Sequence, residues 1–149
     1  MKLALKYGIP VALIFALWII VVRHLLGAGP ESKATTIGPI IFNVVAICAI
    51  FLGIIRRKAE AGGELSFKDG VKTGVGIAAV YAVGTCLFFF IEFLVAGPKL
   101  LMTDAGPTNR PLWQTAVMMY AGLFVGSLFF GLIYSTLISF FLAKRRSAG

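Results

Sequence analysis

Apolar residues gather in four long runs along the chain, at about 7–27, 37–55, 72–97 and 111–143. Each run is close to or above the roughly 17–25 residues that an α-helix needs to cross a bilayer, and most charged residues fall between the runs. The pattern predicts an all-α fold. We expect one polytopic membrane domain over residues 1–149, built as a four-transmembrane-helix bundle.

Two features of these runs need interpretation. The fourth run is longer than a bilayer requires, so we expect its helix to tilt or to project beyond the membrane.

The first run follows Lys2 and Lys6, as the core of a secretory signal would. Its apolar stretch exceeds the roughly 7–15 residues of a signal core, and three further runs follow. We therefore expect this first helix to be retained.

The composition agrees with the pattern. Apolar residues make up 59% of the chain and charged residues 13%, against about 45–50% and about 25% in soluble domains. A soluble domain of this size leaves too much surface exposed to hide so many apolar side chains. The expected surrounding is the lipid bilayer.

The net charge is +8, which in a soluble protein would raise the question of nucleic acid. Because the basic residues flank apolar runs, we expect no nucleic-acid partner and interpret them as topology signals under the positive-inside rule. Four lie on one side of the membrane: Arg23, Lys33, Lys99 and Arg110. Ten lie on the other: Lys2, Lys6, Arg56, Arg57, Lys58, Lys68, Lys72, Lys144, Arg145 and Arg146. Both termini are therefore predicted to be cytoplasmic.

Two basic clusters, at 56–58 and 144–146, stand out within the larger set. Such clusters attract anionic lipid headgroups by about 1 kcal/mol per residue near the surface. A topology signal is a sufficient explanation of both clusters. Contact with anionic lipid is the alternative.

Small residues recur every four positions on the third and fourth runs. Helices in a bilayer associate through close packing, which small side chains permit. The helix-packing residues are predicted to be Gly70, Gly74, Ala78 and Ala82 on the third run and Gly131 and Ser135 on the fourth, where Gly122 and Gly126 add to the pattern. We expect the stripes to hold the bundle together. The alternative is that one stripe forms a homodimer face. A second copy of the chain or another membrane protein is the expected protein partner.

Before the third run, Ser66 and Asp69 have the Ser-x-x-Asp spacing of a capping box. In such a box the serine hydroxyl accepts from the amide three residues on, and the acidic side chain reaches back. The simplest interpretation is the start of a helix rather than a binding site.

Glu92 is the one acidic residue within an apolar run. A carboxylate there is costly and should face the bundle interior or water. Counting from the run ends places Arg23 and Asn43 at a similar depth, so we predict an intramembrane polar layer of Arg23, Asn43 and Glu92. An ion pair that locks two helices is one interpretation. A proton- or cation-coupled binding site is the other.

The chain offers little else for chemistry. It has one histidine and two cysteines, and no nucleophile, base or metal cluster is evident. We predict neither a metal nor another cofactor, and we expect that the protein is not an enzyme. A non-enzymatic accessory or scaffold component is the favoured function, and a small oligomeric transporter that uses Glu92 is the alternative.

Two segments carry a resemblance to a known family. One is Lys-x-x-Leu-Lys-Tyr-Gly at 2–8, and the other is Gly-Gly-Glu-Leu-Ser-Phe-Lys-Asp-Gly at 62–70. With its four spans, the chain resembles a bacterial family of small membrane proteins of unknown function. In that family a Gly-Gly-x-Leu/Ile-Ser-Phe stretch precedes the third span and a Lys-x-Gly follows, here at 72–74. The resemblance covers nearly the whole chain and implies a bacterial inner membrane. It implies no substrate, cofactor or catalytic residue.

Overall fold

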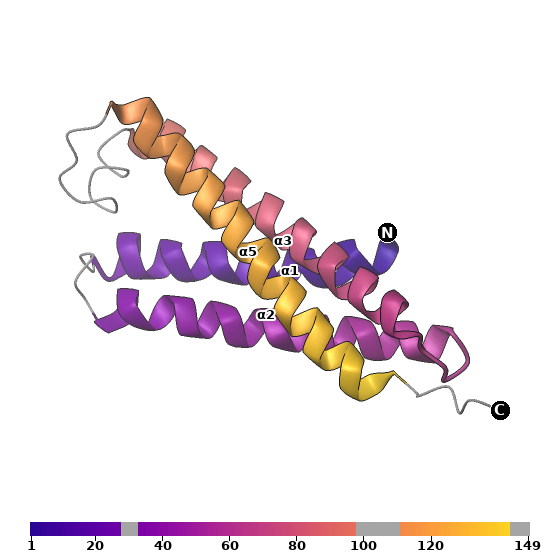
Figure 1. The fold of residues 1–149 in the computed structure, drawn as a ribbon. Coiled ribbons are helices and arrows are strands. Elements are labelled where there is room, and N and C mark those ends of the chain that lie inside the picture. Colours follow the sequence, from indigo (N-terminus) through magenta and orange to yellow (C-terminus); the bar gives the residue numbers. More distant parts are fainter. Residues whose placement is uncertain (28–32, 98–110, 144–149) are drawn as a thin grey trace.

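The structure is a computed structural model that describes residues 1–27, 33–97 and 111–143. Within these ranges the chain is helical and has no strand. The elements are α1 (Lys2–Ile20), a π-helical turn η1 (Val21–Leu25), α2 (Lys33–Glu60), α3 (Phe67–Ala96) and α5 (Leu112–Leu142). Over the described residues, α1, α2, α3 and α5 are each long and apolar enough to cross a membrane (Figure 1). The predicted four-helix membrane fold is confirmed, and the protein is a multi-pass membrane protein.

The helices extend beyond the apolar runs. The first begins at Lys2 rather than near Tyr7, and the second spans Lys33–Glu60 rather than 37–55. Lysine, arginine and glutamate are good helix formers, so a helix continues after its lipid-facing part has ended. An apolar run thus marks the part of a helix that meets lipid, and the helix ends lie further out.

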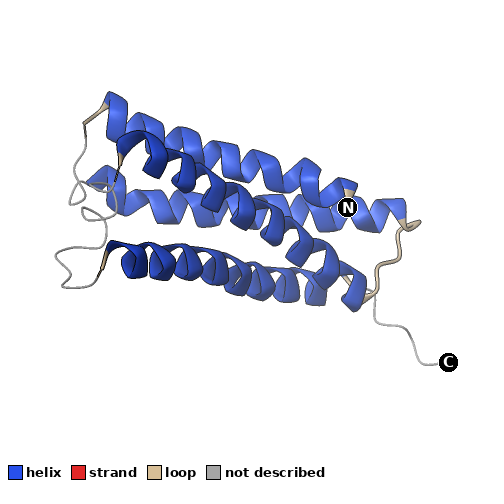
Figure 2. Cartoon of the chain, turned by 90° about the horizontal axis from the view of Figure 1, so that it is seen from above, coloured by secondary structure: helices blue, strands red, loops and turns tan. Residues whose placement is uncertain are grey.

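Both described chain ends lie at the same end of the bundle, beside the α2–α3 connection (Figure 1). We call this the basic end, because Lys2, Lys6, Arg56, Arg57, Lys58, Lys68 and Lys72 lie near it. The opposite end holds the last turn of α3 and the first turn of α5. Helices α1 and α3 therefore run in one direction, and α2 and α5 run in the other (Figure 1). Figure 2 shows the long helices lying side by side.

Helix α3 is the centre of the bundle, because it makes the most extensive contacts with the other helices, above all with α5 and α1. The buried core consists of Val11, Ala46, Ile50, Ile54, Leu65, Ile77, Ala78 and Tyr81. At the opposite end α3 and α5 together diverge from α1 and α2 (Figure 1). With 31 residues, α5 is about 46 Å long, which exceeds the roughly 30 Å hydrocarbon core, so the expectation that it tilts or projects beyond the membrane stays a prediction.

The interface between α3 and α5 is built from the predicted small-residue stripes. A Cβ added at Gly70 would collide with Ser139, one at Gly74 with Ser135, and one at Gly131 with Ala78. The contacts advance four residues at a time in opposite directions along the two antiparallel helices. The same register sets Ala82 opposite Ser127, and both are buried. The two stripes therefore pack against each other within one chain.

A second small-residue interface, between α1 and α3, was not anticipated from the sequence. A Cβ added at Gly8 would lie 2.6 Å from the Cβ of Val80, one at Gly84 would lie 2.7 Å from Ala12, and one at Gly76 would lie 3.5 Å from Ala4. Because these helices are parallel, the contacts advance four residues in the same direction on both. Its signal was present as the four-residue spacing of Ala4, Gly8 and Ala12.

The connection from α2 to α3 is closely bonded at both of its ends. Gly63 N–H donates to the Lys58 carbonyl (2.9 Å) and Gly62 N–H to the Ala59 carbonyl (3.2 Å). These two bonds form a Schellman motif, which requires the positive φ of 72° at Gly62, a conformation that glycine adopts without strain. The end of α2 is thus held by two backbone hydrogen bonds that depend on glycine, and the Gly62-Gly63 turn is not a flexible hinge.

The start of α3 has the predicted cap. The Ser66 hydroxyl accepts from the Asp69 amide (3.1 Å) and donates to Oδ2 of Asp69 (2.7 Å). The acidic side chain therefore reaches back to the hydroxyl of the cap residue. This arrangement satisfies one of the amides that every helix leaves unpaired at its start.

Candidate functional site

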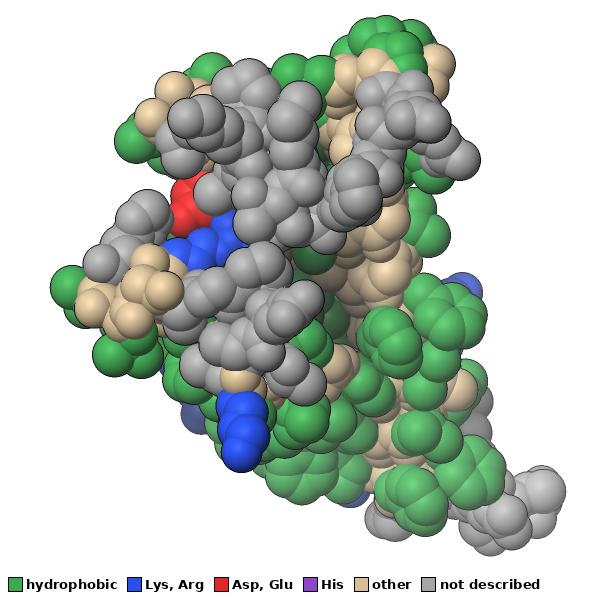
Figure 3. All heavy atoms as spheres, turned by 90° about the vertical axis from the view of Figure 1, so that its left-hand side faces the viewer, with side chains coloured by type: hydrophobic (Ala, Val, Ile, Leu, Met, Phe, Trp, Pro, Cys, Tyr) green, Lys and Arg blue, Asp and Glu red, His purple; other side chains and the backbone are tan. Residues whose placement is uncertain are grey.

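The structure brings together Arg23 and Glu92, from η1 and α3. Arg23 Nη1 lies 3.6 Å from Glu92 Oε2, and their side chains are 20% and 8% exposed. The ion pair bridges α1 and α3 toward the opposite end, where the helix pairs diverge. Figure 3 shows this face, with an acidic side chain beside a basic one.

The arginine belongs to the π-helical turn Val21–Leu25, which directly continues α1. A π turn inserts an extra residue into a helix and rotates the residues after it, and such turns often occur at functional sites. Here the turn is part of the backbone that presents Arg23 to Glu92. The sequence indicated the pair by its depth but gave no signal for the π turn.

Asn43 does not join this pair. Its Oδ1 accepts from the Tyr134 hydroxyl of α5 (2.7 Å), and its Nδ2 donates to the Pro39 carbonyl (2.7 Å). Since α2 begins at Lys33, Asn43 is about 15 Å from the helix start along the axis. The predicted single polar layer is therefore two separate polar groups. The error came from counting depth from the apolar run rather than from the helix end.

The second group lies near the middle of the bundle. The Tyr81 hydroxyl donates to the Ser127 carbonyl (3.2 Å), and the Thr85 hydroxyl donates to the carbonyl of Tyr81 (2.8 Å). Together with the Asn43–Tyr134 bond, these interactions tie α3 and α2 to α5. Tyr134 and the Tyr81–Ser127 bond were not predicted, because a tyrosine in a span is equally compatible with simple apolar packing.

Aromatic rings complete the middle of the bundle. The Phe15 ring centroid is 4.8 Å from that of Phe42 and 5.9 Å from that of Phe89, and Phe42 is 5.5 Å from Tyr81. All three pairs meet edge to face, the geometry that aromatic quadrupoles favour. The rings join α1, α2 and α3 at the depth where the hydroxyl of Tyr81 reaches α5.

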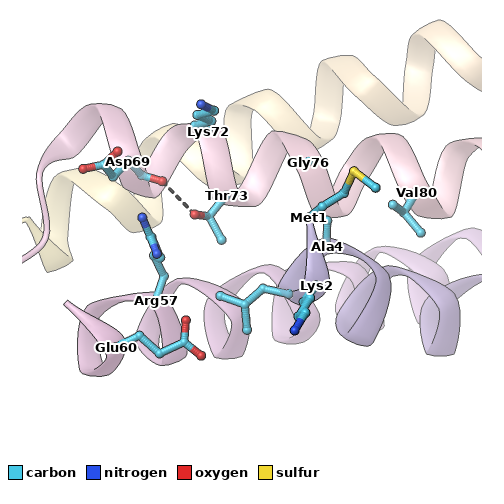
Figure 4. A pocket seen from close by; sticks show the side chains of 11 residues that line it. Met1, Lys2, Ala4, Arg57, Glu60, Asp69, Lys72, Thr73, Gly76 and Val80 are labelled. Atoms are coloured by element: carbon cyan, nitrogen blue, oxygen red, sulfur yellow. Dashed lines mark hydrogen bonds between the residues drawn. The ribbon is translucent and has the colours of Figure 1, made fainter.

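The basic cluster at 56–58 does not act as one patch. Lys58 donates to the carbonyl of Leu142 at the end of α5 (2.9 Å), and Arg56 Nε lies 3.5 Å from Glu60 Oε1. Arg57 faces a pocket at the basic end (Figure 4). The predicted cluster at 144–146 lies outside the described residues.

The described residues hold no group of three histidine, cysteine, aspartate or glutamate side chains placed to bind a metal ion. Polar contacts in the bundle instead join different helices, among them Arg23–Glu92, Tyr81–Ser127 and Asn43–Tyr134. Chemically, the most distinctive group is the Arg23–Glu92 pair, which joins a buried carboxylate to a partly exposed guanidinium.

Comparison of the chain with protein-family models, with curated proteins and with solved structures finds no match. The resemblance to the four-span bacterial family stays a prediction from the sequence. Any function must therefore be argued from the bundle itself.

Proposed function

We propose that the chain is a non-enzymatic accessory or scaffold component that packs against another membrane protein or a second copy of itself. The observation that carries the proposal is that polar side chains inside the bundle join its helices. Tyr134 bonds Asn43, and Tyr81 bonds the backbone of α5. Because these interior polar groups hold the helices together, we infer that the bundle acts through its outer surface.

The proposed contact face lies on α5. A Cβ added at Gly122 or Gly126 would meet no atom within 4 Å, although this spacing of glycines lets another helix backbone approach closely. The glycine and serines further along α5 are already packed against α3. This open face gives the proposal a position that can be tested.

We further propose that the protein resides in a bacterial inner membrane with both termini in the cytoplasm. The support is the excess of lysine and arginine at the basic end, as the positive-inside rule requires of cytoplasmic loops. An alkaline phosphatase fusion at Gly149 should be inactive in cells. Activity of that fusion would contradict the orientation.

The scaffold proposal is tested by purification in mild detergent from native membranes. Wild-type protein should carry a stoichiometric partner, which mass determination identifies as a second copy or another protein. Gly122→Leu combined with Gly126→Leu should release the partner while the bundle keeps its thermal stability. Val117→Phe is the control, because it adds bulk at an exposed position of the same helix, about 140° around from Gly122. A monomer free of partners would contradict the proposal.

The alternative is a small oligomeric proton- or cation-coupled transporter, favoured by the burial of Glu92 at 7% exposure within α3. Buried intramembrane carboxylates often mark ion pathways. Proteoliposomes of the purified protein should then show substrate-dependent proton or cation movement that Glu92→Gln abolishes. Absence of flux across a broad substrate panel would leave the scaffold proposal in place.

A further inference from the structure

A pocket of about 600 Å³ opens at the basic end, between the starts of α1 and α3 and the end of α2 (Figure 4). Its walls come from three segments that are far apart in the sequence, so no sequence motif predicts the pocket. The pocket is independent of the contact face proposed on α5. Its two ends differ in character.

One end of the pocket is charged with both signs. Arg57 points from α2 toward the first turn of α3, which contains Asp69, and Glu60 lies one turn beyond Arg57 on α2 (Figure 4). Among the described residues Arg57 has no salt-bridge partner. Asp69 bonds Ser66 through Oδ2, and Glu60 meets Arg56 through Oε1. Each carboxylate therefore retains an oxygen for a ligand.

Toward its other end the wall of the pocket along α3 is apolar, and Lys2 lies beside it at the start of α1 (Figure 4). Ala4, Gly76 and Val80 line it, and a Cβ added at Gly76 would meet only the Cβ of Ala4, at 3.5 Å. From Asp69 to Val80 the lining of α3 covers about 16 Å along the helix axis. The pocket therefore runs from a charged mouth into an apolar groove, a gradient suited to an amphiphile rather than to a free ion.

We propose that this pocket binds a phospholipid whose headgroup carries a primary ammonium beside its phosphate, as in phosphatidylethanolamine. The phosphate meets Arg57, because guanidinium binds phosphate through paired hydrogen bonds. The ammonium, with three N–H donors, meets Glu60 and Asp69. One acyl chain enters the groove along Gly76 and Val80. Lys2 and Lys72 also line the pocket and add to its positive charge.

The test is lipid titration of the full-length protein by native mass spectrometry. The probes are phosphatidylethanolamine, phosphatidylcholine and phosphatidylglycerol with identical acyl chains. The Kd for phosphatidylethanolamine should be about tenfold lower than the Kd for either of the other lipids. A difference of this size corresponds to about one hydrogen bond between charged groups. Equal binding of all three, or preference for phosphatidylglycerol, would overturn the proposal, since the first indicates unspecific lipid contact and the second a simple anion site.

Two matched pairs of variants locate the site. Arg57→Gln should weaken phosphatidylethanolamine binding about tenfold, whereas Lys68→Gln, which removes the same charge outside the pocket, should not. Glu60→Gln should remove the preference over phosphatidylcholine. Arg56→Gln breaks the same surface ion pair from the other side and should leave the preference unchanged. If the members of either pair behave alike, the pocket does not hold the lipid.

A soluble competitor separates the lipid from a free solute. O-phosphoethanolamine carries the same charged groups without acyl chains. It should displace the lipid only at a concentration at least a hundredfold above that of the lipid, because a molecule without acyl chains makes no contact in the apolar groove. Competition at the same concentration would overturn the proposal in favour of a soluble phosphorylated amine.

Discussion

The two halves of α5 carry the same kinds of small residue and use them differently. Near the basic end, Gly131 and Ser135 are buried against the small residues of α3. Toward the opposite end, Gly122 and Gly126 have open space where a side chain would be. The spacing of small residues therefore shows that a face is able to pack closely, and it does not show what packs there.

The difference also separates two ways of holding helices together. The basic half relies on close backbone approach between α3 and α5, whereas toward the opposite end α3 is joined to α1 by the Arg23–Glu92 pair. Close packing tolerates no added atoms, and an ion pair tolerates no missing partner. Substitutions should therefore fail for different reasons in the two halves.

The largest effect is expected from Gly131→Leu. Its side chain would collide with the Cβ of Ala78 on α3, and overpacking of this kind costs about 3 kcal/mol when backbones must separate. Gly122→Leu should change the free energy of unfolding by less than about 0.5 kcal/mol, as exposed substitutions do. Reversible unfolding in mixed micelles with increasing dodecyl sulfate measures both. If both variants lost a similar free energy of unfolding, the two halves of α5 would not differ in how tightly they are packed.

A smaller effect is expected at the Arg23–Glu92 pair. Removing one partner of a fully buried pair costs about 3–5 kcal/mol. Because the Arg23 side chain is 20% exposed, we expect about 2 kcal/mol for Arg23→Gln or Glu92→Gln alone. The double variant should be close to the wild type, since neither charge is then left without its partner. Thermal unfolding in detergent of all four proteins measures the cycle.

The outcome bears directly on function. If both single variants lose stability and the double variant regains it, Glu92 is a structural partner and the transporter alternative loses its main support. If Glu92→Gln alone is as stable as the wild type or more so, the carboxylate is kept at a cost to stability. Proton-coupled transport then becomes the hypothesis to pursue.

Hydropathy and charge were enough to predict the four helices, because the bilayer imposes helix length and excludes charge. The depth of Glu92 was enough to predict its pairing with Arg23. Asn43 was placed in the wrong layer because depth is measured from the helix end, which polar helix formers had moved outward. The pocket at the basic end was beyond prediction, because three helix ends distant in sequence form it.

The helix starts offer a third contrast between the two ends. Helix α3 begins with the Ser66 cap, whereas α5 begins at Pro111 with no side-chain cap bond. Ser66→Ala should lower the free energy of unfolding by about 1 kcal/mol and speed amide exchange in the first turn of α3. The matched variant Ser139→Ala removes a hydroxyl that packs against Gly70 at the same end of α3 but makes no cap bond, so it should leave that exchange unchanged. Unchanged exchange at Asp69 in Ser66→Ala would show that the hydroxyl contributes little.

The smallest effect is expected at the hydrogen bond between Tyr134 and Asn43, 2.7 Å long. Interhelical hydrogen bonds in membrane proteins contribute about 0.6 kcal/mol on average and about 1.7 at most. Tyr134→Phe removes the donor and keeps the ring that stacks on Phe130, so we expect a loss of about 0.6 kcal/mol. A double-mutant cycle with Asn43→Ala isolates the bond from the second contact that Asn43 makes with the Pro39 carbonyl. A coupling energy near zero would mean that, at this depth, close packing rather than the hydrogen bond joins α2 to α5. The bond between Lys58 and the Leu142 carbonyl would then be the remaining polar contact between these two helices that the structure describes.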